Sequence, residues 1–383
     1  MVELAHHLSA PLAAMHLGDF GADVVKVEGP EGEDWRRWGR PSPAGDSQLF
    51  LAINRNKRSL ALDLGRAEGR AVLERLLASA DVLLTNYAPP VLRELGLEAR
   101  RLRRRHPRLI LCALSGFGAR GPGAERRAFD LIVGGETGLL LLPDGAPAPV
   151  INAAPIADTA GALLLAYGVA LALLHRERTG RAQGAEAALA GAAIALQAHR
   201  FFWLDGEAAP DLRPPRTILY RAYATADGFL TVAVIAERLW QRLCRALGLE
   251  SLLADPRYTP WARLNERQEE LRETLEARFR TRPTDEWLTV LVDAGVPAGR
   301  VQWGAAVFEH PQLEANGIVV RGRDPRAGTY RGMGFPLQLL ATPPRLRRPA
   351  PALGAHSRAV LRELGLPRGE VTRLVRAGAV RAT

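Results

Sequence analysis

Asp158 is a single carboxylate in an apolar stretch of the sequence, and such a group can act as a nucleophile. It lies in PIADTAGALLLAYG, where a loop containing Pro155 leads into an Ala- and Leu-rich segment typical of a helix. A carboxylate that attacks an acyl carbonyl forms a covalent intermediate and divides one difficult transfer into easier steps. The position also suits a helix N-cap, because Asp accepts hydrogen bonds from free backbone N–H groups. Taken alone, the residues favour capping.

The basic residues could bind an anion. The chain has 51 Lys and Arg against 41 Asp and Glu, a net charge of +10, and all but Lys26 and Lys57 are arginine. A phosphorylated ligand, nucleic acid or a membrane surface would fit this charge, as would a simple compositional bias. The arginines are spread along the chain, and the longest basic run, residues 100–108, has no interleaved aromatics. A nucleic-acid-binding protein is therefore the weakest alternative.

Several chemistries are disfavoured because their motifs are absent. The sequence lacks GxGxxG after its first predicted strand, GxxxxGK[ST], HExxH and GxSxG. Cys112 and Cys244 have no metal-ligand spacing, so no metal site is expected. The N-terminal residues carry Glu3 and no basic region, and the apolar runs 161–174 and 189–198 are shorter than the ~20 residues of a membrane span. We expect a cytoplasmic protein with no membrane partner.

The elements that must position these groups alternate between strands and helices over the first 135 residues. This alternation predicts βαβ units and a parallel sheet covered on both faces. After residue 198, a Pro-rich linker and an Asp-Gly hairpin over 222–234 indicate a second region. The main expected elements are strands at the N-terminus, 22–28, 58–64, 80–85 and 109–114, and helices at 10–20, 68–79, within 157–198, and at 237–248, 265–279, 284–294 and 355–364.

The order of several segments carries a resemblance to a known family. These segments are GDFGADVVKVE (18–28), GEDWRRWG (32–39), NRNKRSLALDL (54–64), ADVLLTNYAPPVLRELG (80–96), HPRLILCALSGFGARGP (106–122), RRAFDLIVGGETGL (126–139) and APIADTAGALLLAYG (154–168). Together they closely resemble the family III CoA-transferases, the group that includes formyl-CoA transferase and the carnitine CoA-transferases. Each segment alone is weak evidence, but the segments occur in the same order as in the family, and the resemblance covers almost the whole chain.

The resemblance implies an architecture. The fold would be a large Rossmann-like α/β domain with a parallel sheet and a smaller α+β domain, assembled as an interlocked homodimer. Residues 1–198 would form the N-terminal part of the CoA-binding domain and 199–218 a linker. Residues 219–305 would form the small domain, and 306–383 a return linker and a C-terminal helix that completes the large domain.

The resemblance also implies a reaction and a site. Coenzyme A would pass from an acyl-CoA to a small carboxylic acid through an aspartyl-CoA thioester on Asp158, with no metal and no nucleic acid involved. His6 and His7, which follow the first strand, correspond to positions near the CoA thiol. The residues assigned to CoA are Arg37, Asn54, Lys57, Arg58, Asn86, Tyr87, Arg93 and Arg127, of which Arg93 is displaced by one position from the family pattern.

The main alternative is α-methylacyl-CoA racemase, an isomerase of the same fold. That enzyme moves an α-proton with two positioned bases, one of which is a His where this chain has Phe129. Phenylalanine cannot accept a proton, so the transferase is favoured over the racemase.

Overall fold

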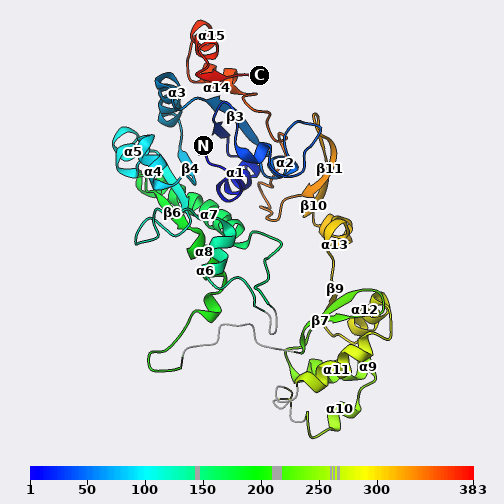
Figure 1. The fold of residues 1–383 in the computed structure, drawn as a ribbon. Coiled ribbons are helices and arrows are strands. Elements are labelled where there is room, and N and C mark those ends of the chain that lie inside the picture. The colour runs from blue at the N-terminus through cyan, green and yellow to red at the C-terminus, as the bar shows by residue number, and fades with distance from the viewer. Residues whose placement is uncertain (143–146, 209–217, 259–260, 262–263, 265–267) are drawn as a thin grey trace. The chain divides into compact units, whose positions relative to one another are not determined.

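The computed structural model describes residues 1–383 apart from 143–146, 209–217, 259–260, 262–263 and 265–267. The chain divides into two compact units (Figure 1). The large unit comprises Met1–Leu212 and Glu314–Thr383, and the small unit comprises Arg213–Leu313. About half of the linker predicted at 199–218 lies outside the described residues, as does the start of the helix predicted at 265–279.

A seven-stranded sheet forms the centre of the large unit. Its strands are β1 (Val2–Leu4), β2 (Val24–Glu28), β3 (Lys57–Leu62), β4 (Val82–Thr85), β5 (Ile110–Ser115), β6 (Ala185–Ala188) and β12 (Val380–Arg381). Their order is β12-β3-β2-β1-β4-β5-β6, and only β12 runs antiparallel to its neighbour. β1, β2 and β4 are wholly buried, which explains their Val- and Leu-rich composition. The α/β fold with a mostly parallel sheet is confirmed.

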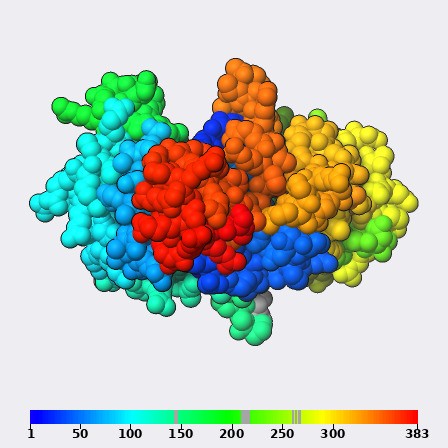
Figure 2. Space-filling model, turned by 90° about the horizontal axis from the view of Figure 1, so that it is seen from above, coloured from blue at the N-terminus to red at the C-terminus, as the bar shows by residue number. Residues whose placement is uncertain are grey.

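Helices bury apolar side chains on both faces of this sheet. The helices of the large unit are α1 (Ser9–Asp19), α2 (Gln48–Ile53), α3 (Ala67–Ala78), α4 (Pro89–Glu94), α5 (Ala99–Arg105), α6 (Asp130–Glu136), α7 (Ile156–Thr179), α8 (Leu189–Leu196), α14 (Ser357–Glu363) and α15 (Arg368–Arg376). α1, α7 and α8 share one apolar core, and α3, α14 and α15 share another. The C-terminal helices therefore complete the large unit, and Figure 2 shows them in red on its surface.

The small unit has its own core. It consists of an antiparallel sheet of β7 (Tyr220–Ala224), β8 (Phe229–Ala233) and β9 (Ala298–Arg300), with α9 (Glu237–Leu247), α10 (Ser251–Ala254), α11 (Gln268–Phe279) and α12 (Thr284–Asp293). Trp287 is fully buried and meets the Phe279 ring edge-on at 5.6 Å. The β7–β8 hairpin turns at Asp227-Gly228, as the sequence predicts.

Several elements are not visible in the sequence pattern. β6 is an Ala-rich strand between two apolar helices, and β9 lies in a segment expected to be a loop. The antiparallel pair β10 (Val319–Asp324) and β11 (Gly328–Met333), helix α15 and strand β12 are likewise additional. These strands are short or lack alternating apolar residues, so their pairing partners rather than their own periodicity determine them.

α7 presents an unusually apolar surface. It is 24 residues long, with a mean hydropathy of 1.8 over its most apolar stretch, so its length and composition alone would allow it to span a membrane. The helix exceeds the apolar run expected at 161–174 because polar residues extend it at both ends. It packs against α1, α8, β5 and β6, but only 33% of the apolar stretch is buried within the chain. Its exposed large apolar side chains are Leu163, Leu164, Tyr167, Leu171 and Leu174.

Candidate active site

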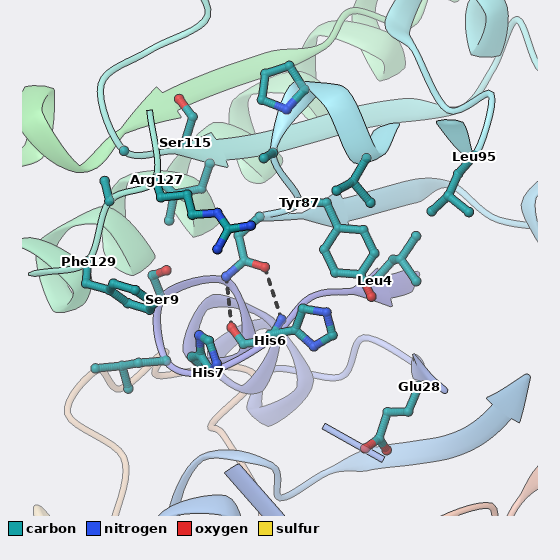
Figure 3. Close-up of a pocket in the computed structure, with 18 of the residues that line it drawn as sticks. Leu4, His6, His7, Ser9, Glu28, Tyr87, Leu95, Ser115, Arg127 and Phe129 are labelled. Atoms are coloured by element: carbon teal, nitrogen blue, oxygen red, sulfur yellow. Dashed lines mark hydrogen bonds between the residues drawn. The ribbon is translucent and has the colours of Figure 1, made fainter. Parts of the chain in front are cut away.

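A cavity of about 750 Å³ opens at the carboxyl ends of the central strands of the large unit. In parallel α/β sheets this edge is where ligands bind, and the volume lies within the usual range for small-molecule sites. The cavity is lined by the ends of all five strands β1 to β5, the turn into α1, the residues before α6, and the first turn of α7 (Figure 3). Among its residues are His6, His7, Ser9, Asn86, Tyr87, Arg127, Phe129 and Asp158.

Asp158 lies in the first turn of α7, and it is not the N-cap. Pro155 holds the N-cap position, and Asp130 at the start of α6 accepts a hydrogen bond from the backbone N–H of Asp158 at 3.0 Å. Burial, with the nearby charge of Asp130, raises the pKa of Asp158 to about 6, although a hydrogen bond from Ser9 partly offsets this. The Asp158 carboxylate is thus half-buried, ionised at neutral pH and not used as a helix cap. An ionised carboxylate without a capping role is free to act as a nucleophile.

Asn86 and Tyr87 follow β4 and meet the end of β1. The Asn86 side chain accepts a hydrogen bond from the His6 backbone N–H at 3.0 Å and donates one to the His6 carbonyl at 2.8 Å. Tyr87 stacks on the His6 ring, with ring centroids 4.6 Å apart, and burial raises the pKa of its hydroxyl to about 12. The Asn86 amide is thus occupied by protein backbone, whereas the Tyr87 ring forms part of the cavity wall.

His7 and Phe129 form a wall near the carboxylate. Their ring centroids are 5.8 Å apart, and both residues line the cavity. Ser9, which hydrogen-bonds to Asp158, is two residues beyond His7. Asp130, which accepts the Asp158 N–H, directly follows Phe129. His7, Phe129 and Asp158 all line the same cavity.

Arg127 is a cation that faces the cavity. Figure 3 shows its side chain extending into the space above His6, and no carboxylate partner is found for it among the residues that the structure describes. Its neighbour Arg126 also lines the cavity, but its guanidinium pairs with Glu136 at 2.6 Å and lies 4.6 Å over the Phe117 ring. A free guanidinium in a cavity is well suited to bind phosphate.

Three residues predicted to bind CoA are committed to contacts away from this cavity. Lys57 and Asn54 are fully buried, and the Lys57 ammonium contacts Glu3 at 2.8 Å and the Asn54 side-chain oxygen at 2.7 Å. Arg58 pairs with Asp23 and Glu363 on the far side of β3. Within the basic segment 54–59, Lys57 begins β3 and its side chain is fully buried, whereas Arg58 pairs with carboxylates that are more than half exposed.

Arg37 and Arg93 are exposed and also lie outside the cavity. Arg37 donates to the Glu31 carbonyl and approaches Asp34, while Arg93 pairs with Glu125 at 2.6 Å. The structure therefore brings together Asp158, Asn86, Tyr87 and Arg127 of the predicted residues, and not Arg37, Asn54, Lys57, Arg58 and Arg93.

Sequence reasoning did not identify Ser9, Asp130 or Glu33 as site residues. Asp130 follows the Phe129 position that separates transferase from racemase, and this adjacency was the available signal. Ser9 is a plausible helix-start residue and carries no other mark. Glu33 lies within GEDWRRWG, where the arginines drew attention instead, and its carboxylate accepts the backbone N–H of His7 at 2.7 Å.

Comparisons with known proteins identify the family of this chain. The model of CoA-transferase family III matches residues 1–357 of the chain. The chain belongs to CoA-transferase family III. This confirms the resemblance found in the sequence and shows that the protein is an enzyme of that family.

The similarity of this CoA-transferase to individual relatives extends over nearly the full length. The succinate–glutarate CoA-transferase of Agrobacterium fabrum is 34% identical over 95% of this chain and 94% of its own length. The acetyl-CoA:oxalate CoA-transferase of Acetobacter aceti is 30% identical over 96% and 95%. The crystal structure of a CaiB/BaiF family protein from Brucella suis superimposes with a TM-score of 0.84, at 32% identity over 95% of this chain and 97% of that one.

Proposed function

We propose that this enzyme transfers coenzyme A between carboxylic acids through a covalent aspartyl-CoA thioester on Asp158. The observation that carries the proposal is the place of Asp158. It is the carboxylate at the α7 N-terminus, it lines the cavity, and its side chain makes no ion pair among the described residues. Acyl-CoA as substrate follows from membership of the family.

The transfer proceeds in balanced steps. The Asp158 carboxylate attacks the thioester carbonyl of the donor, the C–S bond breaks, and the CoA thiolate leaves, which gives a mixed anhydride. The thiolate then attacks the aspartyl carbonyl and expels the donor carboxylate, which leaves an aspartyl-CoA thioester. An acceptor carboxylate repeats these steps in reverse, so acyl-CoA forms and Asp158 is regenerated. Covalent catalysis of this kind conserves the free energy of the thioester.

The surroundings of Asp158 suit this chemistry. The positive end of the α7 dipole stabilises the carboxylate and the oxyanion formed at the attacked carbonyl. The raised pKa of Asp158 makes it a stronger nucleophile than a solvated aspartate while leaving it ionised above about pH 6. Arg127 would bind CoA phosphates, and the Tyr87 ring would contact the apolar part of CoA. Phe129 offers no base for proton abstraction, so nothing at that position supports the racemase.

We further propose that the working form is a homodimer. The exposed face of α7 carries Leu163, Tyr167 and Leu171, and apolar side chains continue over 201–204, with Phe202 77% exposed. Contiguous apolar surfaces of this kind usually mark a protein interface. Sedimentation should show a dimer that persists on dilution, and a freely dissociating monomer would contradict the proposal.

A donor and acceptor screen tests the reaction. Relatives are named for succinate, glutarate, D-citramalate and oxalate, so succinyl-CoA and acetyl-CoA should be offered with these acids first. New acyl-CoA formed by the wild type and absent with Asp158→Asn is the expected result. Equal transfer by both proteins would overturn the role of Asp158. Deuterium exchange at Cα of a 2-methylacyl-CoA without CoA transfer would overturn the reaction itself.

A further inference from the structure

The segment 5–11, which comprises the turn between β1 and α1 (5–8) and the first residues of α1, is held at its backbone by side chains from other elements. It carries His6, His7 and Ser9 into the cavity. Figure 3 draws two of the contacts as dashed lines at His6. The backbone bonds are Lys26 to the Ala5 carbonyl (3.1 Å), Asn86 to the His6 N–H (3.0 Å) and carbonyl (2.8 Å), Glu33 to the His7 N–H (2.7 Å) and Lys57 to the Pro11 carbonyl (2.7 Å).

Three of these side chains belong to a buried ion cluster. Glu3, Lys26, Glu33 and Lys57 all have fully or almost fully buried side chains. The Lys26 ammonium lies 2.8 Å from both Glu3 and Glu33, and the Lys57 ammonium lies 2.8 Å from Glu3. Two carboxylates balance two ammonium groups, so the cluster is neutral as a whole. Desolvation makes such clusters costly, and apolar residues of similar size are often as stable.

The conformation of His7 shows what the turn requires. Its φ is 60°, a left-handed value that only His7 and Asn56 adopt among the described residues other than glycine. A residue held in this region costs on the order of 1–3 kcal/mol and persists where its surroundings over-determine it. The charge-assisted bond from the His7 N–H to Glu33 supplies that constraint on one side, and the double bond from Asn86 to His6 supplies it on the other.

We propose that Glu33 and Asn86 are positioning residues that clamp the β1–α1 turn from opposite sides, so that Ser9 and the His6 and His7 rings keep a fixed place beside Asp158. This rests on the proposed function, because the clamp matters only if Asp158 reacts. Neither residue touches the substrate in this account. Asn86 in particular acts through His6 and does not bind the adenosine of CoA.

Kinetics of Asn86→Ala separate this role from ligand binding. The variant leaves the buried charges intact, so it should fold. A residue that positions the reacting groups should lower kcat by about ten- to a hundredfold and leave KM for acyl-CoA within about twofold, because small misplacements are costly in the chemical step. A raised KM with unchanged kcat would show direct contact with CoA and would overturn the proposal.

Glu33 is tested by two substitutions and a matched control. Glu33→Ala removes the acceptor for the His7 N–H, whereas Glu33→Gln keeps an oxygen there but removes the charge. The control is Asp19→Asn, which disturbs another buried ion pair, with Arg55 at 2.7 Å, and makes no contact with the turn. We expect kcat to fall about tenfold or more in Glu33→Ala, to recover in large part in Glu33→Gln, and to stay within about twofold in Asp19→Asn.

Hydrogen exchange supplies a readout that is independent of turnover. Amides of residues 5–10 should exchange faster in Asn86→Ala and Glu33→Ala than in the wild type, while Glu33→Gln and Asp19→Asn change them little. Unaltered exchange in this segment, or kcat losses that merely follow the loss of stability in all variants, would overturn the clamp. An inactive wild type would instead refute the proposed function, so the two failures are distinguishable.

Discussion

Polar residues occupy two regions of one sheet, and their side chains are paired differently in the two. At the ends of β4, β5 and the start of α7, Tyr87, Arg127 and Asp158 face a cavity and make few ion pairs. On the β2 and β3 side, Lys26 and Lys57 are fully buried and each contacts a carboxylate at 2.8 Å. The charged side chains of Arg127 and Asp158 have no ion-pair partner among the described residues and are available to a ligand. The paired charges of Lys26 and Lys57 instead hold neighbouring strands together.

The difference follows from strand position. β1, β2 and β3 are adjacent, so Glu3, Lys26 and Lys57 meet beneath the β1–α1 turn and neutralise one another. β4 and β5 lie on the other side of β1, where the chain leaves the sheet in loops and in helix N-termini that face the cavity. Residue type alone does not separate the two groups, since both contain basic residues and carboxylates.

The largest effect should come from the reactive carboxylate. Asp158→Asn keeps the size of the side chain but removes the nucleophile, so kcat should fall by at least about a thousandfold. The free energy of unfolding at pH 7 should not fall. Because the pKa of Asp158 is raised in the folded protein, its ionised form is less stable there than in the unfolded chain, so removing the charge costs no stability. Initial rates of acyl-CoA formation and urea unfolding measure the two quantities. A variant that unfolds more easily would place Asp158 in the scaffold region instead.

Breaking the buried ion cluster should lower the free energy of unfolding. Lys26→Met leaves Glu3 and Glu33 with only Lys57 as a cation, and removal of one partner from a buried ion pair costs about 3–5 kcal/mol. The free energy of unfolding in urea measures the loss. A change below about 1 kcal/mol would show that the cluster contributes no more than a surface pair.

Substitution of Arg127 should weaken acyl-CoA binding without lowering stability. Arg127→Ala should raise KM for acyl-CoA by about tenfold or more with no loss of stability, since a hydrogen bond to a charged group contributes about 1.5–3 kcal/mol. Arg126→Ala is the matched control, because Arg126 also lines the cavity but is paired with Glu136, so its loss should leave KM within about twofold. Equal effects of the two substitutions would remove the distinction between a free and a committed arginine.

The pH profile should report the environment of Asp158. Because its pKa is raised to about 6, kcat/KM should fall as the pH drops through 6, by about tenfold at pH 5. The sign follows from the nucleophile being the ionised form. An acidic limb near pH 4 would mean that the carboxylate is as well solvated as a free aspartate.

The smallest effect is expected at the exposed arginines. Arg93 pairs with Glu125 at 2.6 Å, with both side chains at least half exposed, so Arg93→Ala should change stability by less than about 1 kcal/mol. KM for acyl-CoA should also remain unchanged, because Arg93 lies outside the cavity. A clear rise in KM would place CoA beyond the cavity and return Arg93 to the binding site.

The sequence predicted a parallel sheet and the longer helices, and Asp158 stays its prediction for the nucleophile. Strand β4 is a buried run of apolar residues, which local pattern reveals. β6 and β12 are short strands whose partners are far away in the chain. The local pattern of apolar residues does not indicate such pairing. The place of Asp158 came from the family resemblance, since the residues alone favoured an N-cap.

The burial and contacts of individual polar side chains could not be predicted from the sequence. Lys57 lies in a basic segment that the family resemblance assigned to CoA, yet its partner Glu3 is on β1, two strands away in the sheet. Asn86 was predicted to bind CoA, and it does line the cavity, but its bonds to the His6 backbone depend on how β1 and β4 align. Burial and pairing of polar groups are properties of the assembled sheet, so they require the structure.

Covalent trapping tests the central claim most directly. The wild-type enzyme is incubated with an acyl-CoA that the screen identifies as a donor, quenched with hydroxylamine, digested and examined by mass spectrometry. A hydroxamate on the peptide that contains Asp158, dependent on acyl-CoA and absent from Asp158→Asn, is the predicted result. Active transfer with no modification at Asp158, or with modification at another carboxylate, would contradict this account.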